Sequence, residues 1–162
     1  MGPRLRIAQL APPYEAVPPA RYGGTERVIW ALTEELVRRG HDVTLFASGD
    51  SRTSAQLVPI VDRALWAEDE LQDGLAYIAM ALDNLYGRAH EFDVIHNHDQ
   101  LTALPLARLR PGTPTVTTMH GRLDRPDYQQ LFERFREQPV VSISDSQRAP
   151  LPEANWLATV YN

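Results

Sequence analysis

The chain of 162 residues is long enough for one domain, and its hydrophobic content of 43% supports a full core, which excludes a disordered chain. Its formal net charge of −5 argues against nucleic-acid binding, because such proteins need a basic face to replace counterions. The absence of cysteine excludes disulfides, thiolate metal sites and cysteine nucleophiles and fits a cytoplasmic protein, and the absence of lysine excludes a lysine phosphate clamp.

Strand-like and helix-like segments alternate along the first half of the chain. An apolar run at residues 5–10 predicts a buried strand, too short for a signal sequence or a membrane span, and a loop rich in proline and glycine follows it. Apolar residues at three- and four-residue spacing predict a helix that begins at Thr25 and is ended by Gly40. Two further strands are expected at residues 42–47 and 57–61.

The second half of the chain repeats this alternation. Helices are expected at residues 71–90, 101–109 and 128–136, and strands at 92–96, 114–119, 140–144 and 156–160. Strands and helices that alternate on short connections form a parallel sheet covered on both faces. The sequence therefore predicts a single α/β domain, a doubly wound Rossmann-like parallel sheet, with Trp30, Trp66 and Trp156 as core or packing residues.

Unusual polar residues follow several predicted strands, at the edge where ligands bind in sheets of this kind. These residues are His96, His98, Asp99, His120 and Ser144. His41 is the exception, because it precedes a strand and is expected at the opposite edge. Random placement would rarely bring these groups to one edge, so this edge is the predicted ligand site.

Gly23 and Gly24 precede the first predicted helix. Glycine lets the backbone approach a ligand closely, and the free N–H groups and dipole of a helix N-terminus favour a phosphate. The alternative is an ordinary pair of loop glycines. The chain has neither the G-x-G-x-x-G pattern of dinucleotide binding nor a Walker A loop, which argues against a Rossmann dehydrogenase.

The histidines and Ser144 each allow more than one interpretation. His96 and His98 are two residues apart, so on a strand they point the same way and with Asp99 could bind a metal, but such a group more often lines a polar cleft. His120 precedes a glycine that leaves room near the imidazole, and its role is either a hydrogen bond to a ligand or a structural one. Ser144 is a helix N-cap signal, and capping alone and a ligand role are equally supported.

Taken together, these residues resemble the N-terminal domain of retaining glycosyltransferases of the GT-B fold, in the large family-four group. The matching segments run from Tyr22 to Arg27, Phe92 to Asp99, Thr117 to Gly121, Val141 to Ser144 and Val160 to Asn162. They occur in the family's order and span nearly the whole chain. The Gly-Gly-x-Glu element that begins at Gly23 and the strand-end His120-Gly121 pair are each moderately specific. Together they are strongly specific for the family, and they say little about the sugar.

The resemblance implies a role for each candidate residue. Gly23 and Gly24 would lie near the diphosphate of a nucleotide-sugar donor, and His120 would contact the donor sugar at the reaction centre. His98 and Asp99 would border the acceptor. The residues Tyr22, Gly121 and Ser144 would line the same cleft. No metal or cofactor is expected, because the nucleotide-diphosphate sugar is a substrate and helix N-termini and basic side chains meet its charge.

The resemblance also implies that residues 1–162 are the N-terminal, acceptor-side half of a hexosyltransferase of carbohydrate biosynthesis. The C-terminal donor-binding domain is absent and would be supplied in cis or in trans, so this half alone is expected to be inactive or weak. The acceptor would be a sugar, a lipid or a small molecule, and peripheral membrane association stays open. Two alternatives remain: a nucleotide-sugar 2-epimerase of the same architecture, and a non-catalytic module that docks a separate donor-binding subunit.

Overall fold

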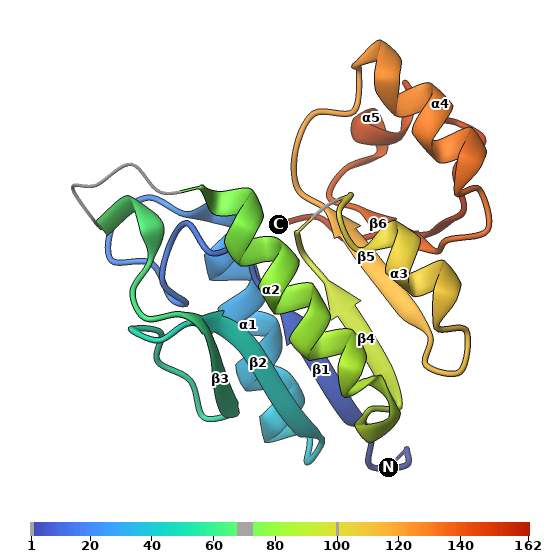
Figure 1. The fold of residues 1–162 in the computed structure, drawn as a ribbon. Coiled ribbons are helices and arrows are strands. Elements are labelled where there is room, and N and C mark those ends of the chain that lie inside the picture. The colour runs from blue at the N-terminus through green and yellow to red at the C-terminus, as the bar shows by residue number, and fades with distance from the viewer. Residues whose placement is uncertain (1, 68–72, 100) are drawn as a thin grey trace.

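The structure is a computed structural model that describes residues 2–67, 73–99 and 101–162. Within these residues, seven parallel strands form one sheet in the order β3-β2-β1-β4-β5-β6-β7 (Figure 1). The strands are β1 (Arg6–Leu10), β2 (Asp42–Ser48), β3 (Gln56–Val61), β4 (Val94–Asn97), β5 (Thr115–Met119), β6 (Val140–Ser142) and β7 (Trp156–Thr159). The predicted doubly wound Rossmann-like sheet is confirmed.

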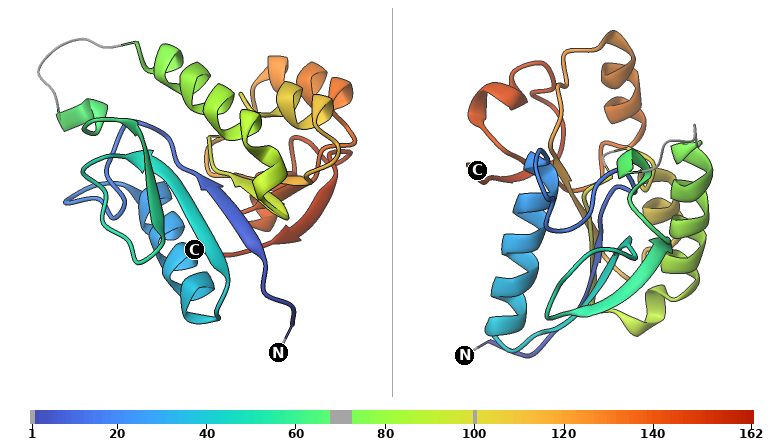
Figure 2. Two further views of the ribbon diagram at one scale, coloured as in Figure 1. Left: turned by 60° about the horizontal axis from the view of Figure 1, so that its bottom comes forward. Right: turned by 90° about the vertical axis from the view of Figure 1, so that its left-hand side faces the viewer.

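Five α-helices and two short 3₁₀ helices are found among the described residues. They are α1 (Gly24–Arg38), η1 (Leu65–Ala67), α2 (Gly74–Gly87), η2 (Ala89–Glu91), α3 (Leu104–Leu109), α4 (Pro126–Arg134) and α5 (Asp145–Arg148). Helix α1 covers one face of the sheet, and α2 and α3 cover the other (Figure 2). None of these described helices has the length and apolar character needed to cross a membrane.

The chain reverses its direction across the sheet between β1 and β4. From β1 it proceeds to β2 and β3, and it then returns past β1 to build β4 to β7 on the other side. In open parallel sheets the carboxyl ends of the strands at such a reversal border the ligand crevice. The register aligns Gln9 of β1 with His96 of β4, so the topology alone brings these two polar residues side by side at that point.

Hydrophobic burial on both faces holds the helices against the sheet. On the α2 and α3 face, Leu10 and Phe46 pack with Leu82, Leu85 and other apolar side chains. On the opposite face, Ile29 of α1 packs with Leu45 of β2 and the buried loop residue Val17. The burial of aliphatic and aromatic side chains is the main favourable contribution to the free energy of folding.

Most predicted elements are observed, with three differences. The predicted helix 71–90 ends earlier, at Gly87, where η2 follows; its first two positions lie outside the described residues. The short helix η1 was not predicted, whereas α5 follows the predicted N-cap signal at Ser144. Of the tryptophans predicted as core or packing residues, Trp30 and Trp66 are not in the core, because they are 40% and 64% exposed; Trp66 packs its ring against Tyr14 at 5.5 Å between centroids.

The loop between β1 and α1 is held by buried backbone hydrogen bonds. The Val17 N–H donates to the Ser51 hydroxyl at 2.9 Å, and the Val17 carbonyl accepts from the Arg52 N–H at 2.7 Å. Gly23, at the end of this loop, has φ of +143°, a conformation open to glycine and strained for other residues. At the far end of α1, Gly40 has φ of +88° and ends the helix as predicted.

We expect the two neighbouring glycines to respond differently to alanine. A Cβ at Gly23 would lie 2.7 Å from the side chain of Pro19 and 2.9 Å from Glu26 Oε2, whereas a Cβ at Gly24 would meet nothing within 4 Å. Gly23→Ala should therefore lower the free energy of unfolding by about 1–3 kcal/mol. Gly24→Ala, the matched control, should change it by less than about 1 kcal/mol. Urea unfolding measures both, and equal effects would contradict this account of the loop.

Candidate functional site

Three imidazoles gather at the carboxyl edge of the sheet, as predicted. His96 and His98 project from the same face of β4 and its extension, with their rings stacked at 4.1 Å between centroids. The ring of His120, which follows β5, lies 5.2 Å from that of His98. His96 Nε2 is within 2.8 Å of the hydroxyl of Thr118 on the neighbouring strand. The edge therefore carries a compact histidine cluster.

A chain of hydrogen bonds joins this cluster to the neighbouring strand β1. The side-chain oxygen Oε1 of Gln9 lies 2.8 Å from His98 Nε2, and His98 Nδ1 lies 2.9 Å from His120 Nε2. The backbone N–H of His98 also donates to the backbone carbonyl of Leu10 on β1 at 2.9 Å. We call Gln9, His98 and His120 the relay. It runs from β1 through the end of β4 to the end of β5 and so spans the reversal in strand order.

Burial keeps the imidazoles of the cluster neutral. Desolvation lowers the pKa of His96 from 6.5 to about 4, with a smaller contribution from the charge of His120. Desolvation also lowers the pKa of His120 to about 4, and it lowers that of His98, which is 1% exposed, well below its usual value. At neutral pH the rings therefore act as neutral donors and acceptors of hydrogen bonds.

Asp99 is a half-buried carboxyl at the same edge. Its Oδ2 accepts a hydrogen bond from the Thr102 hydroxyl, and its backbone N–H donates to Asn97 Oδ1 at 3.0 Å. Desolvation raises the pKa of Asp99 from 3.8 to about 6, against the opposing effect of the Thr102 hydrogen bond. A carboxyl with a pKa close to neutral is suited to exchange protons with a ligand.

His120 lines an open cavity of about 410 Å³ beside β5 and β6. The other lining residues are Gly121, Arg122, Leu123, Asp124, Ile143, Ser144, Ser146, Gln147 and Pro150. Three predicted site residues, His120, Gly121 and Ser144, thus share one cavity. His98 is buried and reaches it only through His120.

Gln147 of α5 fixes the backbone on both sides of His120. Its amide Nε2 donates to the carbonyls of Met119 and Gly121, each at 2.8 Å, and its Oε1 accepts from the Ile143 N–H at 2.9 Å. Ser144 accepts from the Gln147 N–H at 3.2 Å and so acts as the predicted N-cap of α5. The ends of β5 and β6 are therefore tied together around the imidazole.

The N-terminus of α1 is a separate part of the same edge. Tyr22 is 82% exposed, Gly24 is exposed and Gly23 is buried. Glu26 in the first turn is also buried, and desolvation raises the pKa of its carboxyl. No hydrogen bond between described residues joins this turn to the histidine cluster, so the structure does not bring the glycines into the relay.

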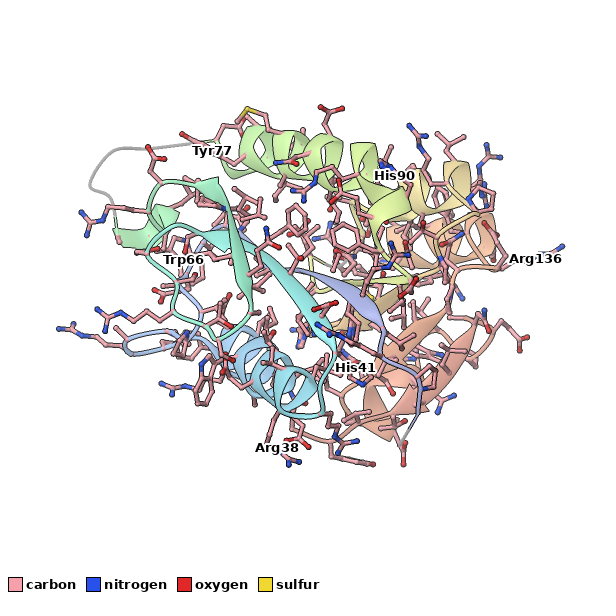
Figure 3. The ribbon with its side chains drawn as sticks, turned by 90° about the horizontal axis from the view of Figure 1, so that it is seen from below. Arg38, His41, Trp66, Tyr77, His90 and Arg136 are labelled. Atoms are coloured by element: carbon pink, nitrogen blue, oxygen red, sulfur yellow. The ribbon has the colours of Figure 1, made fainter. Side chains whose placement is uncertain are left out.

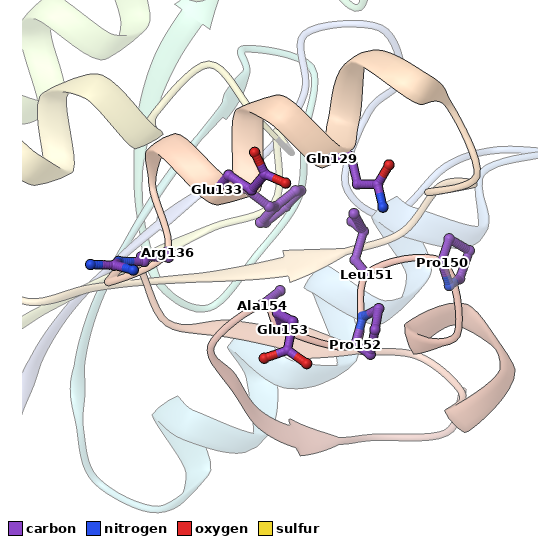
Figure 4. A pocket seen from close by; sticks show the side chains of 9 residues that line it. Gln129, Glu133, Arg136, Pro150, Leu151, Pro152, Glu153 and Ala154 are labelled. Atoms are coloured by element: carbon purple, nitrogen blue, oxygen red, sulfur yellow. The ribbon is translucent and has the colours of Figure 1, made fainter.

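Two other regions lie apart from the cluster. His41 is at the amino-terminal edge of the sheet, which faces the viewer in Figure 3, where its Nδ1 accepts from the Leu5 N–H at 3.2 Å. A second cavity of about 360 Å³ lies between α4 and the segment 150–154 (Figure 4). Its apolar floor includes Leu151 and Phe132, and Glu133, Arg136 and Glu153 border it. It adjoins the His120 cavity at Pro150.

Three residues of the site were not predicted from the sequence. Gln9 is a polar residue within the apolar run of β1, and its polarity at a position expected to be buried was the one sequence feature that could have indicated a role. Glu26 follows the glycine pair in the first turn of the helix, where the helix dipole commonly stabilises a carboxylate, so its position offered no reason to expect a further role. Gln147 offered no signal, because only the folded chain shows which carbonyls its amide reaches.

The metal alternative has no support in the geometry. Within residues 2–67, 73–99 and 101–162, no three His, Asp or Glu side chains are arranged to hold a metal ion. His96 and His98 stack face to face, and their Nε2 atoms are directed at Thr118 and Gln9.

The fold and the geometry of the site define a Rossmann-like α/β domain with a histidine cluster and an open cavity at the carboxyl edge of its sheet. Residues 22–149 match the sequence model of the family described as Glycosyltransferase Family 4. This match covers more than half of the chain and includes the glycine pair, the histidine cluster and Ser144. The chain therefore belongs to Glycosyltransferase Family 4.

A solved glycosyltransferase shares the fold. The structure of AviGT4, a glycosyltransferase involved in avilamycin A biosynthesis, superposes with a TM-score of 0.56 at 20% sequence identity. The match covers 91% of this chain and 39% of that protein, so this chain spans well under half the length of its structural relative. No curated protein sequence matched the chain.

We expect acid to destabilise the protein between pH 6.5 and about 4. In this window the unfolded histidines bind protons, whereas His96, His98 and His120 in the folded state do not, because their pKa values are lowered. The unfolded state therefore binds more protons, and the free energy of unfolding falls as the pH falls. Urea unfolding at several pH values measures this slope, and His120→Asn should reduce it.

Asp99 provides the matched control for this linkage. Its raised pKa means that the folded state binds more protons than the unfolded state between about pH 6 and 3.8, which opposes the effect of the histidines. Asp99→Asn should therefore make the loss of stability on acidification steeper. A stability that stays constant from pH 6.5 to 4 in the unmodified protein would refute the buried, neutral state of the cluster.

Proposed function

We propose that the chain is the N-terminal, acceptor-side half of a retaining glycosyltransferase. The enzyme moves a hexose from a nucleotide-diphosphate donor to a hydroxyl of a sugar, a lipid or a small molecule. A second, donor-binding domain completes the site. The observation that carries the proposal is the neutral imidazole of His120, which lines an open cavity at the carboxyl edge of a family-four glycosyltransferase domain.

His120 is suited to hold a sugar hydroxyl. Its position is fixed from one side by His98 and from the other by the backbone hydrogen bonds of Gln147. A neutral imidazole forms directional hydrogen bonds without attracting the leaving diphosphate by charge. A group held in this way loses little freedom when the substrate binds, which lowers the cost of reaching the transition state.

The N-terminus of α1 supports a role in binding the diphosphate. The first N–H groups of a helix lack intrahelical partners, and its dipole attracts negative charge. The hard step of transfer is departure of the diphosphate as the sugar gains oxocarbenium character. Donors directed at the developing phosphate charge lower that barrier. The space around Gly24, where a Cβ would meet nothing within 4 Å, leaves room for the donor to approach.

Gly24→Val should reduce sugar transfer while leaving the fold intact. The new side chain meets no protein atom within 4 Å of its Cβ, so it would occupy the space assigned to the diphosphate. In the enzyme that joins this domain to its donor-binding half, we expect a loss of about 10²-fold or more in turnover. Gly112→Val is the control, because a Cβ there also meets nothing. Unchanged turnover in Gly24→Val would remove the phosphate role.

His120→Ala should lower turnover far more than stability. Loss of the imidazole removes a hydrogen-bonding group from the reaction centre, which typically costs about 10²–10⁴-fold. The ring is only partly buried, so the urea midpoint should change much less than for a core substitution. His41→Ala, at the opposite edge, should leave turnover unchanged. An unaltered rate in His120→Ala would exclude His120 from the site.

The proposed reaction is tested by a panel of nucleotide-diphosphate sugars with and without acceptor. Transfer with retained anomeric configuration supports it. Conversion of the free donor to its 2-epimer without acceptor would support the epimerase alternative instead. Absence of both, together with tight binding of a separate donor-binding subunit, would identify a non-catalytic module.

A further inference from the structure

Gln9 is the one member of the relay that the proposed function does not explain. It lies near the carboxyl end of strand β1, is 0% exposed, and its Oε1 is the side-chain partner of His98 Nε2. Among the described residues, only two buried polar side-chain atoms lack a hydrogen-bond partner, and they are Gln9 Nε2 and the Thr33 hydroxyl oxygen. A buried donor without a partner is costly, so an amide kept here for the fold alone would be unexpected.

The direction of each hydrogen bond in the relay follows from the amide. An amide oxygen only accepts, so the contact of Gln9 Oε1 with His98 Nε2 requires the proton of His98 to be on Nε2. A neutral imidazole carries one proton, which leaves His98 Nδ1 as an acceptor. The nitrogen that faces it, His120 Nε2, must then donate. His120 therefore has a bare Nδ1.

We propose that Gln9 is a positioning residue that sets the tautomer of His120, so that His120 presents an unprotonated Nδ1 to a substrate hydroxyl in the cavity. The identity of the substrate rests on the proposed function, whereas the tautomer of His120 is inferred from the hydrogen bonds of the relay. Within the part of the chain that the structure describes, no hydrogen bond involves Nδ1 of His120, while the residue itself lines the open cavity. This nitrogen is therefore available to a ligand.

The opposite orientation of the amide would reverse every hydrogen bond of the relay. Gln9 Nε2 would donate to His98 Nε2, His98 would donate through Nδ1, and His120 would carry its proton on Nδ1. His120 would then offer a donor to the substrate instead of an acceptor. The amide of Gln9 thus decides which partner the cavity recognises, although Gln9 itself does not reach the cavity.

The tautomers can be measured directly in the 162-residue chain labelled with ¹⁵N-histidine. Long-range ¹H–¹⁵N spectra at neutral pH distinguish a protonated ring nitrogen from a bare one. We expect protonated Nε2 and bare Nδ1 for both His98 and His120. Protonated Nδ1 in both rings would overturn the proposal, and so would a mixture of tautomers. The spectrum of the unmodified protein decides this without any variant.

Gln9→Met tests whether the amide is the cause. Methionine matches the length of glutamine but lacks its strong acceptor, so His98 and His120 should each populate both tautomers. Thr118→Val is the matched control, because it removes the hydrogen bond of His96 and should leave the relay unchanged. Tautomers in Gln9→Met that match those of the unmodified protein would overturn the proposal.

These spectra are independent of the transfer assay. If no donor sugar is transferred but the predicted tautomers are observed, the proposed function fails and the role of Gln9 in the relay stands. If transfer occurs but the tautomers are reversed, the role of Gln9 fails alone. Once a donor is known, Gln9→Met should lower turnover at least 10-fold, whereas Thr118→Val should have a smaller effect.

Discussion

The site depends on one physical constraint: polar side chains buried at the centre of a parallel sheet must satisfy one another. Gln9, His98 and His120 come from three neighbouring strands or their ends, and each imidazole of the relay has its hydrogen-bond partner on a neighbouring element. Such networks are stabilising only when their geometry is kept, so they restrict how the strands can shift. The order β1-β4-β5 thus places the functional groups and also limits their movement.

Two further features support this arrangement from outside the sheet. The amide of Gln147 holds the carbonyls on both sides of His120, and the buried loop through Val17 leads the chain to the positive-φ turn at Gly23. The first fixes the imidazole, and the second fixes where helix α1 begins. The nucleotide-sugar donor that we propose has an anionic part and a hydroxylated part, and these would meet the two features at the same edge of the sheet.

Much of this architecture was predictable from the sequence, because local patterns determine it. Alternating apolar runs gave the seven strands, and Gly40 and Ser144 marked a helix end and a helix start. The exposed positions of Trp30 and Trp66 were not predictable, because residue type does not show on which side of a helix or loop a ring lies. The relay was predicted only in part. The histidines were found from their places after strands, whereas their link to Gln9 depends on pairing between residues 89 positions apart.

The hydrogen bonds of Gln147 have a consequence for motion. The short helix α5 and the segment after β5 are joined through one side chain that touches the backbone before and after His120. The backbone that carries the imidazole of His120 is therefore coupled to α5. A displacement of α5 would be transmitted through this side chain to the backbone on both sides of His120.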